Sequence, residues 1–101
     1  MSAVLDYINR HGRPRRGLSS LPPIECADGF RMSVQVGRML YCTPRDDDGP
    51  WTEVEVGFPT AAEPDLLPYM DGEDDPTQCV YGYVPFEIVD AIIARHGGIR
   101  P

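Results

Sequence analysis

Residues 79–98 constrain the fold more than any other part of this 101-residue chain. Residues 79–84 alternate between two faces and lie between Pro76 and Pro85, which is typical of a buried strand. From residue 86 the apolar positions follow helical spacing, and Pro85 suits the first position of that helix. Its apolar stripe comprises Phe86, Val89, Ile92 and Ile93, widened by Ile88. With Gly97 suited to end the helix, this stretch predicts a core strand that leads into a core helix.

Period-two alternation predicts further strands in the first sixty residues. A strand is expected over residues 30–36, whose inward face holds Phe30, Met32, Val34 and Val36. The glycine of Gly37-Arg38 fits a two-residue hairpin turn, which predicts a return strand over residues 39–43. After a loop over residues 44–50, alternation resumes and predicts another strand over residues 51–58.

The remaining segments complete an α+β prediction. Ser2 suits the cap of a short helix over residues 3–11, and residues 13–23 form a connector with three arginines. Residues 66–70 are expected to form a short edge strand or a packed turn. The domain expected over 1–101 has its N-terminal helix and Arg-rich connector in residues 1–25 and its core in residues 26–101. The expected fold is an antiparallel sheet of four or five strands, with the C-terminal helix packed on one face and a short N-terminal helix.

Charge is distributed unevenly along the chain. The formal net charge is −7, and every basic residue among the nine is arginine. Residues 1–45 carry a net charge of +4, whereas residues 46–101 carry −11. Such asymmetry bears on partners and solubility, because fields of this kind steer association between macromolecules.

Two acidic loops and one strand face are the candidate contact residues. Carboxylates clustered in this way are typical of solvated loops, of calcium sites or of a surface that imitates nucleic-acid phosphate. Neither loop has the ligand spacing of a calcium-binding helix-loop-helix. The candidate partner-binding residues are Asp46, Asp47, Asp48, Glu53, Glu55, Glu73, Asp74 and Asp75, with Trp51 as a possible anchor.

Aromatic residues offer a second candidate surface. Strict alternation would place Tyr81 and Tyr83 together, on the side of the sheet opposite Val80, Gly82 and Val84. Those rings would then either form a protein-binding face rimmed by carboxylates or lie in a second small core, covered by the N-terminal helix and by residues 66–70. The sequence leaves both interpretations open.

No pattern in the sequence indicates catalysis, a metal or a cofactor. The three cysteines, Cys26, Cys42 and Cys79, are widely spaced and are expected to be buried apolar residues. A zinc site built from them and His96 would lack the closely paired ligands that such sites show. His11 and His96 both stand at expected helix ends, where capping explains them. We therefore expect a protein that is not an enzyme and that has no catalytic residues, no metal site and no cofactor.

Composition also limits the partners and the compartment. The arginines of residues 13–23 have no aromatic residues between them, so direct nucleic-acid binding is not expected. No apolar run approaches the ~20 residues of a membrane span, and the N-terminus does not resemble a secretory signal. The expectation is a cytoplasmic protein, as a monomer or a small homo-oligomer, with no membrane partner.

Two segments, residues 41–59 and 80–98, resemble a family of small uncharacterised proteins of tailed bacteriophages and prophages. The resemblance covers roughly residues 30–98 and implies action inside a bacterial host cell, without implying catalytic residues. Together with the acidity, it suggests an accessory protein that binds a host protein or ribonucleoprotein complex. Inhibition of a bacterial defence complex, as by an anti-CRISPR protein, is the preferred hypothesis. The alternative is a small virion structural or assembly protein that self-associates.

Overall fold

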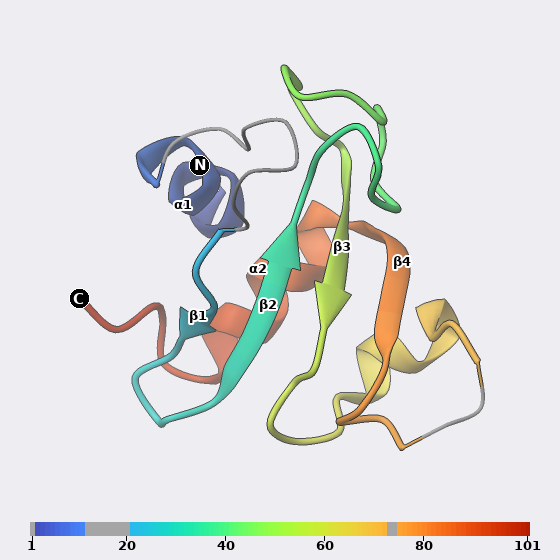
Figure 1. Ribbon diagram of the computed structural model, residues 1–101. Coiled ribbons are helices and arrows are strands. Elements are labelled where there is room, and N and C mark those ends of the chain that lie inside the picture. The colour runs from blue at the N-terminus through green and yellow to red at the C-terminus, as the bar shows by residue number, and fades with distance from the viewer. Residues whose placement is uncertain (1, 12–20, 73–74) are drawn as a thin grey trace.

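The computed structural model describes residues 2–11, 21–72 and 75–101, and it confirms an α+β fold (Figure 1). Four antiparallel strands form one open sheet in the order β1-β2-β3-β4, and α2 lies behind it in Figure 1. No helix in the described ranges has the length and apolar character needed to span a bilayer. In chain order the elements are α1 (Ala3–Arg10), β1 (Ile24–Glu25), β2 (Arg31–Gln35), β3 (Glu53–Gly57), the 3-10 helix η1 (Pro64–Tyr69), β4 (Val80–Pro85) and α2 (Phe86–Arg95).

The core lies between one face of the sheet and the two α-helices. The alternating residues predicted to face inward from residue 30 are all buried, and Val54 and Val56 of β3 join them. From α2, the side chains of Val89, Ile92 and Ile93 fill the space behind the sheet. The predicted helical stripe is therefore confirmed, because its spacing places these side chains on one side of the helix.

Helix α2 ends as predicted and begins one residue later than predicted. Pro85 is the last residue of β4 and caps the helix, with φ −55° and ψ 136°, so the first helical residue is Phe86. At the other end, Gly97 has φ 89°, and its N–H donates to the carbonyl of Ala94 at 3.2 Å. The N–H of Gly98 donates to the carbonyl of Ile93 at 2.9 Å. These two bonds satisfy carbonyl groups that the helix end would leave without partners.

Helix α1 docks on α2 through a backbone contact as well as apolar packing. The Ser2 hydroxyl accepts the Leu5 N–H at 3.1 Å, as expected of a capping residue. The Asp90 carboxylate of α2 accepts the Val4 N–H at 2.8 Å. An acidic side chain at this position also complements the positive end of the α1 dipole. Asp90 therefore fastens α1 to α2.

The return strand predicted over residues 39–43 is absent, and a long loop connects β2 to β3. The Cys42 thiol lies 3.3 Å from the N–H of Gly37 and 3.2 Å from its carbonyl, which folds the chain back on itself. The backbone N–H of Tyr41 donates to the Glu55 carboxylate at 2.9 Å instead of joining a ladder. A single bridge between Thr43 and Glu53 is the pairing seen in residues 39–43.

Two short segments differ from a simple reading of the sequence. Residues 24–25 form β1, an edge strand inside the region predicted as helix and connector, and Ile24 is fully buried. Most of the Arg-rich connector lies outside the described residues. Residues 64–69 form η1 with Leu66 fully buried, so of the two alternatives proposed there the packed turn is confirmed and the edge strand is not.

A β-bulge in β4 separates the two tyrosines that strict alternation placed on one face. Val54 pairs with Val84 and Val56 pairs with Tyr81, so Glu55 stands opposite Gly82 and Tyr83 together. The extra residue turns Tyr83 outward, with 41% of its surface exposed, while Tyr81 is fully buried in the core. The alternation prediction was therefore wrong for Tyr81.

Candidate functional site

The first acidic loop, residues 46–48, has a fixed shape. One carboxylate oxygen of Asp46 accepts the N–H groups of Asp48 at 3.0 Å and of Gly49 at 2.9 Å. These two bonds stabilise the charged form and lower the pKa of Asp46 below its usual value. The Asp46 carboxylate therefore fixes the backbone of the loop at Asp48 and Gly49.

The three aspartates of this acidic loop differ in their surroundings. Asp47 accepts the backbone N–H of Arg38 at 3.0 Å, and its other oxygen lies 3.5 Å from the Arg38 guanidinium. Asp48 is exposed at the surface, whereas Asp46 and Asp47 are half-buried. Charge is thus presented outward chiefly by Asp48 and the outer part of Asp47.

Glu53 and Glu55 hold the loop against the sheet. Both project from the face of β3 opposite the buried Val54 and Val56, and both are half-buried. Glu53 accepts the hydroxyl of Thr43 at 2.6 Å, and Glu55 accepts the N–H of Tyr41 at 2.9 Å. The sequence predicted these glutamates as contacts for a partner. The structure gives them a positioning role as well, because each fixes one residue of the β2–β3 loop.

Two exposed tyrosines, Tyr41 and Tyr83, meet on this side of the sheet, and we name them the tyrosine pair. Their ring centroids are 5.9 Å apart at an interplanar angle of 35°, and the Tyr83 N–H donates to the Tyr41 carbonyl at 3.0 Å. The guanidinium of Arg45 lies 5.7 Å from the centre of the Tyr41 ring. Nearby in the same loop, Met39 is 80% exposed. The acidic loop and Tyr41 therefore belong to one folded loop between β2 and β3, and this loop contacts β4 at Tyr83.

Trp51 lies in the core, where the sequence predicted a surface anchor. Its side chain is 4% exposed, and its indole N–H donates to the Asp46 carbonyl at 3.2 Å. A Cβ atom at Gly49 would lie 2.7 Å from the indole ring, so the loop packs directly on the ring. The strand begins at Glu53, two residues later than predicted, which leaves Trp51 under the loop. Trp51 therefore supports the acidic loop from beneath.

The structure does not bring the two predicted acidic loops together. Residues 46–48 precede the start of β3, and Asp75 precedes the start of β4, its antiparallel neighbour. The two positions therefore lie toward opposite ends of these strands. Asp75 accepts the N–H and the hydroxyl of Thr77 at 2.9 and 2.8 Å, which lowers the pKa of its carboxyl group. The other two predicted contacts there, Glu73 and Asp74, lie outside the described residues.

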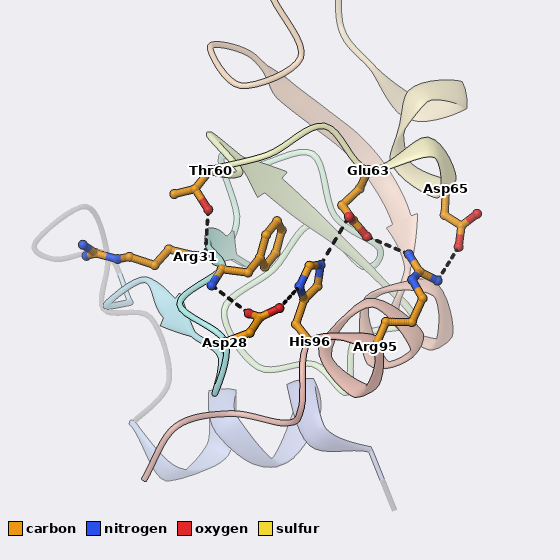
Figure 2. A network of polar contacts seen from close by, with 8 residues as sticks. Asp28, Arg31, Thr60, Glu63, Asp65, Arg95 and His96 are labelled. Atoms are coloured by element: carbon orange, nitrogen blue, oxygen red, sulfur yellow. Dashed lines mark hydrogen bonds and ion pairs between the residues drawn. The ribbon is translucent and has the colours of Figure 1, made fainter.

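A polar network that the sequence did not predict joins the end of α2 to two loops (Figure 2). The His96 ring lies between two carboxylates, with Nδ1 2.6 Å from Asp28 and Nε2 3.2 Å from Glu63. Arg95 donates to Glu63 at 2.6 Å and to Asp65 at 2.9 Å. Glu63, with 7% of its surface exposed, is the buried charged residue of this network.

The electrostatics of this network favour a charged histidine. The hydrogen bond to Asp28, followed by that to Glu63, raises the pKa of His96, while the hydrogen bonds to Phe30 and His96 lower the pKa of Asp28. The imidazole also stacks on the Phe30 ring, with centroids 4.1 Å apart. His96 caps the helix as predicted and also links three separate segments, which is a structural role.

Other potentially reactive groups are dispersed or buried. Within the described part of the chain, no three His, Cys, Asp or Glu side chains converge on a position that would hold a metal ion. Cys26, Cys42 and Cys79 are buried free thiols, as the sequence predicted. Burial raises the pKa of Cys26 and Cys42 above the usual thiol value, which disfavours the nucleophilic thiolate.

An open cleft of about 550 Å³ lies at the other edge of the sheet, beside α1 and β1. Its cationic groups come from Arg10 and Arg100, and Arg100 forms an ion pair with Glu25 at 2.7 Å. His11 also lines the cleft. The remaining walls come from Tyr7, Pro22, Pro23, Ile99 and Pro101. The described basic side chains of this cleft thus lie at the β1 edge, whereas the tyrosine pair lies at the β4 edge.

Comparison of the chain with protein-family models, with curated proteins and with solved structures found no match. The resemblance to bacteriophage proteins stays a prediction from the sequence. Function must accordingly be argued from the surface itself. Its most distinctive part is the acidic loop with the adjoining tyrosine pair.

Proposed function

We propose that this protein is a non-enzymatic accessory protein of bacteriophage type that binds a nucleic-acid-handling complex of its bacterial host and inhibits it. A defence complex such as a CRISPR effector is the target class that the proposal favours, and the bacterial cytoplasm is the proposed location. The observation that carries the proposal is the pre-formed acidic loop, whose carboxylates are presented beside two exposed tyrosines.

The charge of the chain supports this proposal. A protein of net charge −7 with most of its acids in the second half meets a basic nucleic-acid groove with complementary charge. Complementary fields increase the rate of encounter and fix the orientation of the partners. The same charge repels nucleic acid, so the proposed partner is the protein surface that nucleic acid would otherwise occupy.

The fixed shape of the loop supports it as well. Asp46 holds two backbone N–H groups, Trp51 packs beneath the loop, and Glu55 fastens Tyr41 to the sheet. A surface that is ordered before binding loses less conformational entropy when a partner docks. A rigid set of carboxylates is therefore better suited to imitate phosphates than a mobile acidic tail.

Affinity capture from a bacterial lysate, followed by mass spectrometry, tests the proposal. The test variant is Asp47→Asn with Asp48→Asn, which removes two charges from the loop and leaves Asp46 in place. The control is Asp6→Asn with Glu87→Gln, which removes two charges from exposed positions of the helices. The parent and the control should recover a nucleic-acid-handling complex, and the loop variant should lose it. Equal recovery by all three proteins would contradict the proposed surface.

Self-association in a virion is the second candidate, and the position of the basic cleft favours it. Arg10 and His11 lie at the β1 edge, away from the acidic loop, so a cleft of one copy suits the loop of the next. Heterologous contacts of this kind build rings or filaments. Size-exclusion chromatography with light scattering at low and high salt distinguishes the candidates. A salt-sensitive oligomer supports assembly, whereas a monomer at both salt concentrations supports inhibition.

A further inference from the structure

Among the described residues, no helix covers the outer side of β3 and β4 (Figure 1). The exposed rings of Tyr41 and Tyr83 meet on this side. The β-bulge places Gly82 and Tyr83 together opposite Glu55. Tyr41 packs so closely over Gly82 that a Cβ atom there would lie 3.2 Å from the Tyr41 Cβ. Tyr41 and Tyr83 each remain 41% exposed. Two aromatic rings are thus held at the surface, close to Glu55.

The tyrosine pair already accepts a cation within the chain. The Arg45 guanidinium lies 5.7 Å from the centre of the Tyr41 ring, while its Nε donates to the Leu40 carbonyl at 2.9 Å. Guanidinium groups are attracted to the faces of aromatic rings and are weakly hydrated, so they stack there at low cost. The surroundings therefore suit an arginine better than an anion or an apolar side chain.

We propose that Tyr41 and Tyr83 anchor the interface and receive an arginine side chain of the partner protein. This inference rests on the proposed function, because the arginine is supplied by the basic surface that the acidic loop is proposed to meet. The guanidinium packs against the exposed ring surface, and the carboxylates of Asp47 and Asp48 lie in the loop that carries Arg45. The tyrosine pair takes the anchoring role that the buried Trp51 cannot perform.

Arginine fits this surface better than lysine does. An ammonium group is compact and strongly hydrated, whereas a planar guanidinium stacks on a ring and retains donors at its edge for carboxylates. Nucleic-acid bases also stack on tyrosine, but their phosphates would be repelled by the acidic loop. The expected order of affinity is therefore an arginine peptide first, a lysine peptide second and an oligonucleotide last.

An NMR titration of the isotope-labelled full chain tests this inference. The probes are a hexa-arginine peptide, a hexa-lysine peptide and a single-stranded oligonucleotide, each at low salt. We expect the arginine peptide to shift the resonances of Tyr41, Gly82 and Tyr83 and to bind more tightly than the lysine peptide. Tyr83→Ala and Tyr83→Leu should each weaken the arginine peptide about threefold to tenfold, because each removes one aromatic face.

Phe58→Ala is the matched control. Phe58 is also an exposed aromatic residue, 55% exposed, with a left-handed backbone at φ 51°, but it follows β3 at the end away from Tyr83. Its replacement should leave peptide affinity unchanged. Equal binding of both peptides, with no effect of either Tyr83 variant, would overturn the anchoring role and leave the acidic-loop proposal standing. Binding of neither peptide, or tighter binding of the oligonucleotide, would overturn both.

Discussion

Replacing Tyr83 by alanine and by glycine should reverse the usual order of stability in a strand. Tyr83 has φ 54°, a left-handed backbone in which a Cβ atom is crowded. That conformation costs a residue with a Cβ about 1–2 kcal/mol and costs glycine almost nothing. In an ordinary strand, glycine is less stable than alanine by roughly 0.5–1 kcal/mol. At position 83 the two effects oppose each other, and glycine should be more stable than alanine by about 0.5–1 kcal/mol.

The side chain contributes separately from the backbone. Both variants remove the ring contact with Tyr41 and the buried part of the Tyr83 ring. This loss should lower the free energy of unfolding by about 1–2 kcal/mol. Tyr83→Ala should therefore be clearly less stable than the parent, and Tyr83→Gly should recover part of the loss. The difference in stability between the two variants measures the contribution of the backbone conformation alone.

Urea unfolding followed by the fluorescence of Trp51 measures these differences. Arg31→Ala and Arg31→Gly form the control, since Arg31 is an exposed residue of β2 that is not among the residues with positive φ. At position 31 the glycine variant should be less stable than the alanine variant. If glycine is also the less stable residue at position 83, the backbone there is not left-handed, and the bulge that turns Tyr83 outward is refuted.

Three other predictions concern the loop, the network and the thiols. Gly49→Ala should destabilise the protein by about 2–3 kcal/mol, because the new Cβ would press on the Trp51 ring and φ is 72°. The hydrogen bond to Asp28 raises the pKa of His96. Protonated His96 therefore stabilises the fold below pH ~6.5, and this stabilisation is lost as the pH rises through the pKa of His96 in the folded protein. His96→Gln should reduce this fall in the free energy of unfolding, measured by urea unfolding between pH 5.5 and 8.5. Cys42 should react with a thiol reagent at least about tenfold more slowly in the folded protein than in urea, since burial raises its pKa.

Each of these three has a control or a contradicting result. Gly29→Ala introduces a Cβ at φ 95° with open space around it, so it should cost less than Gly49→Ala; equal costs would mean that Trp51 does not pack under the loop. A His96→Gln variant whose stability depends on pH as the parent's does would contradict the network. Labelling of Cys42 as fast in the folded as in the unfolded protein would contradict its burial.

The sequence predicted elements that depend on near neighbours. The strand and helix of residues 79–98 were identified because alternation, helical spacing and Gly97 are local signals. The inward face of β2 followed from the same rule. The cap at Ser2 was found because its partner is three residues away.

Features fixed by distant contacts were missed. Residues 39–43 have the composition of a strand, but Glu55 binds the N–H of Tyr41 from fourteen residues away and holds it out of a ladder. The bulge in β4 leaves no trace in a pattern of alternation, because it depends on pairing with β3. The His96 network joins residues 68 and 33 positions apart, which no local motif encodes.

The candidate surface was predicted in part. Aspartates beside glycine and proline indicated the acidic loop correctly, whereas the burial of Trp51 was not apparent from its position before an alternating run. Tyr81 and Tyr83 could not be assigned to the surface or to the core, since the two interpretations differed only in what covers their rings. The structure decides that question differently for each: Tyr81 is buried and Tyr83 is exposed.

Competition with nucleic acid tests the central claim most directly. The complex recovered by affinity capture is mixed with its labelled nucleic acid, and bound nucleic acid is measured as each protein is added. The parent and the Asp6→Asn, Glu87→Gln control should displace the nucleic acid at the same concentration, and the Asp47→Asn, Asp48→Asn variant should require much more protein. If the parent binds the complex without displacing nucleic acid, or if all three proteins compete equally, the acidic loop does not occupy a nucleic-acid site and the account is contradicted.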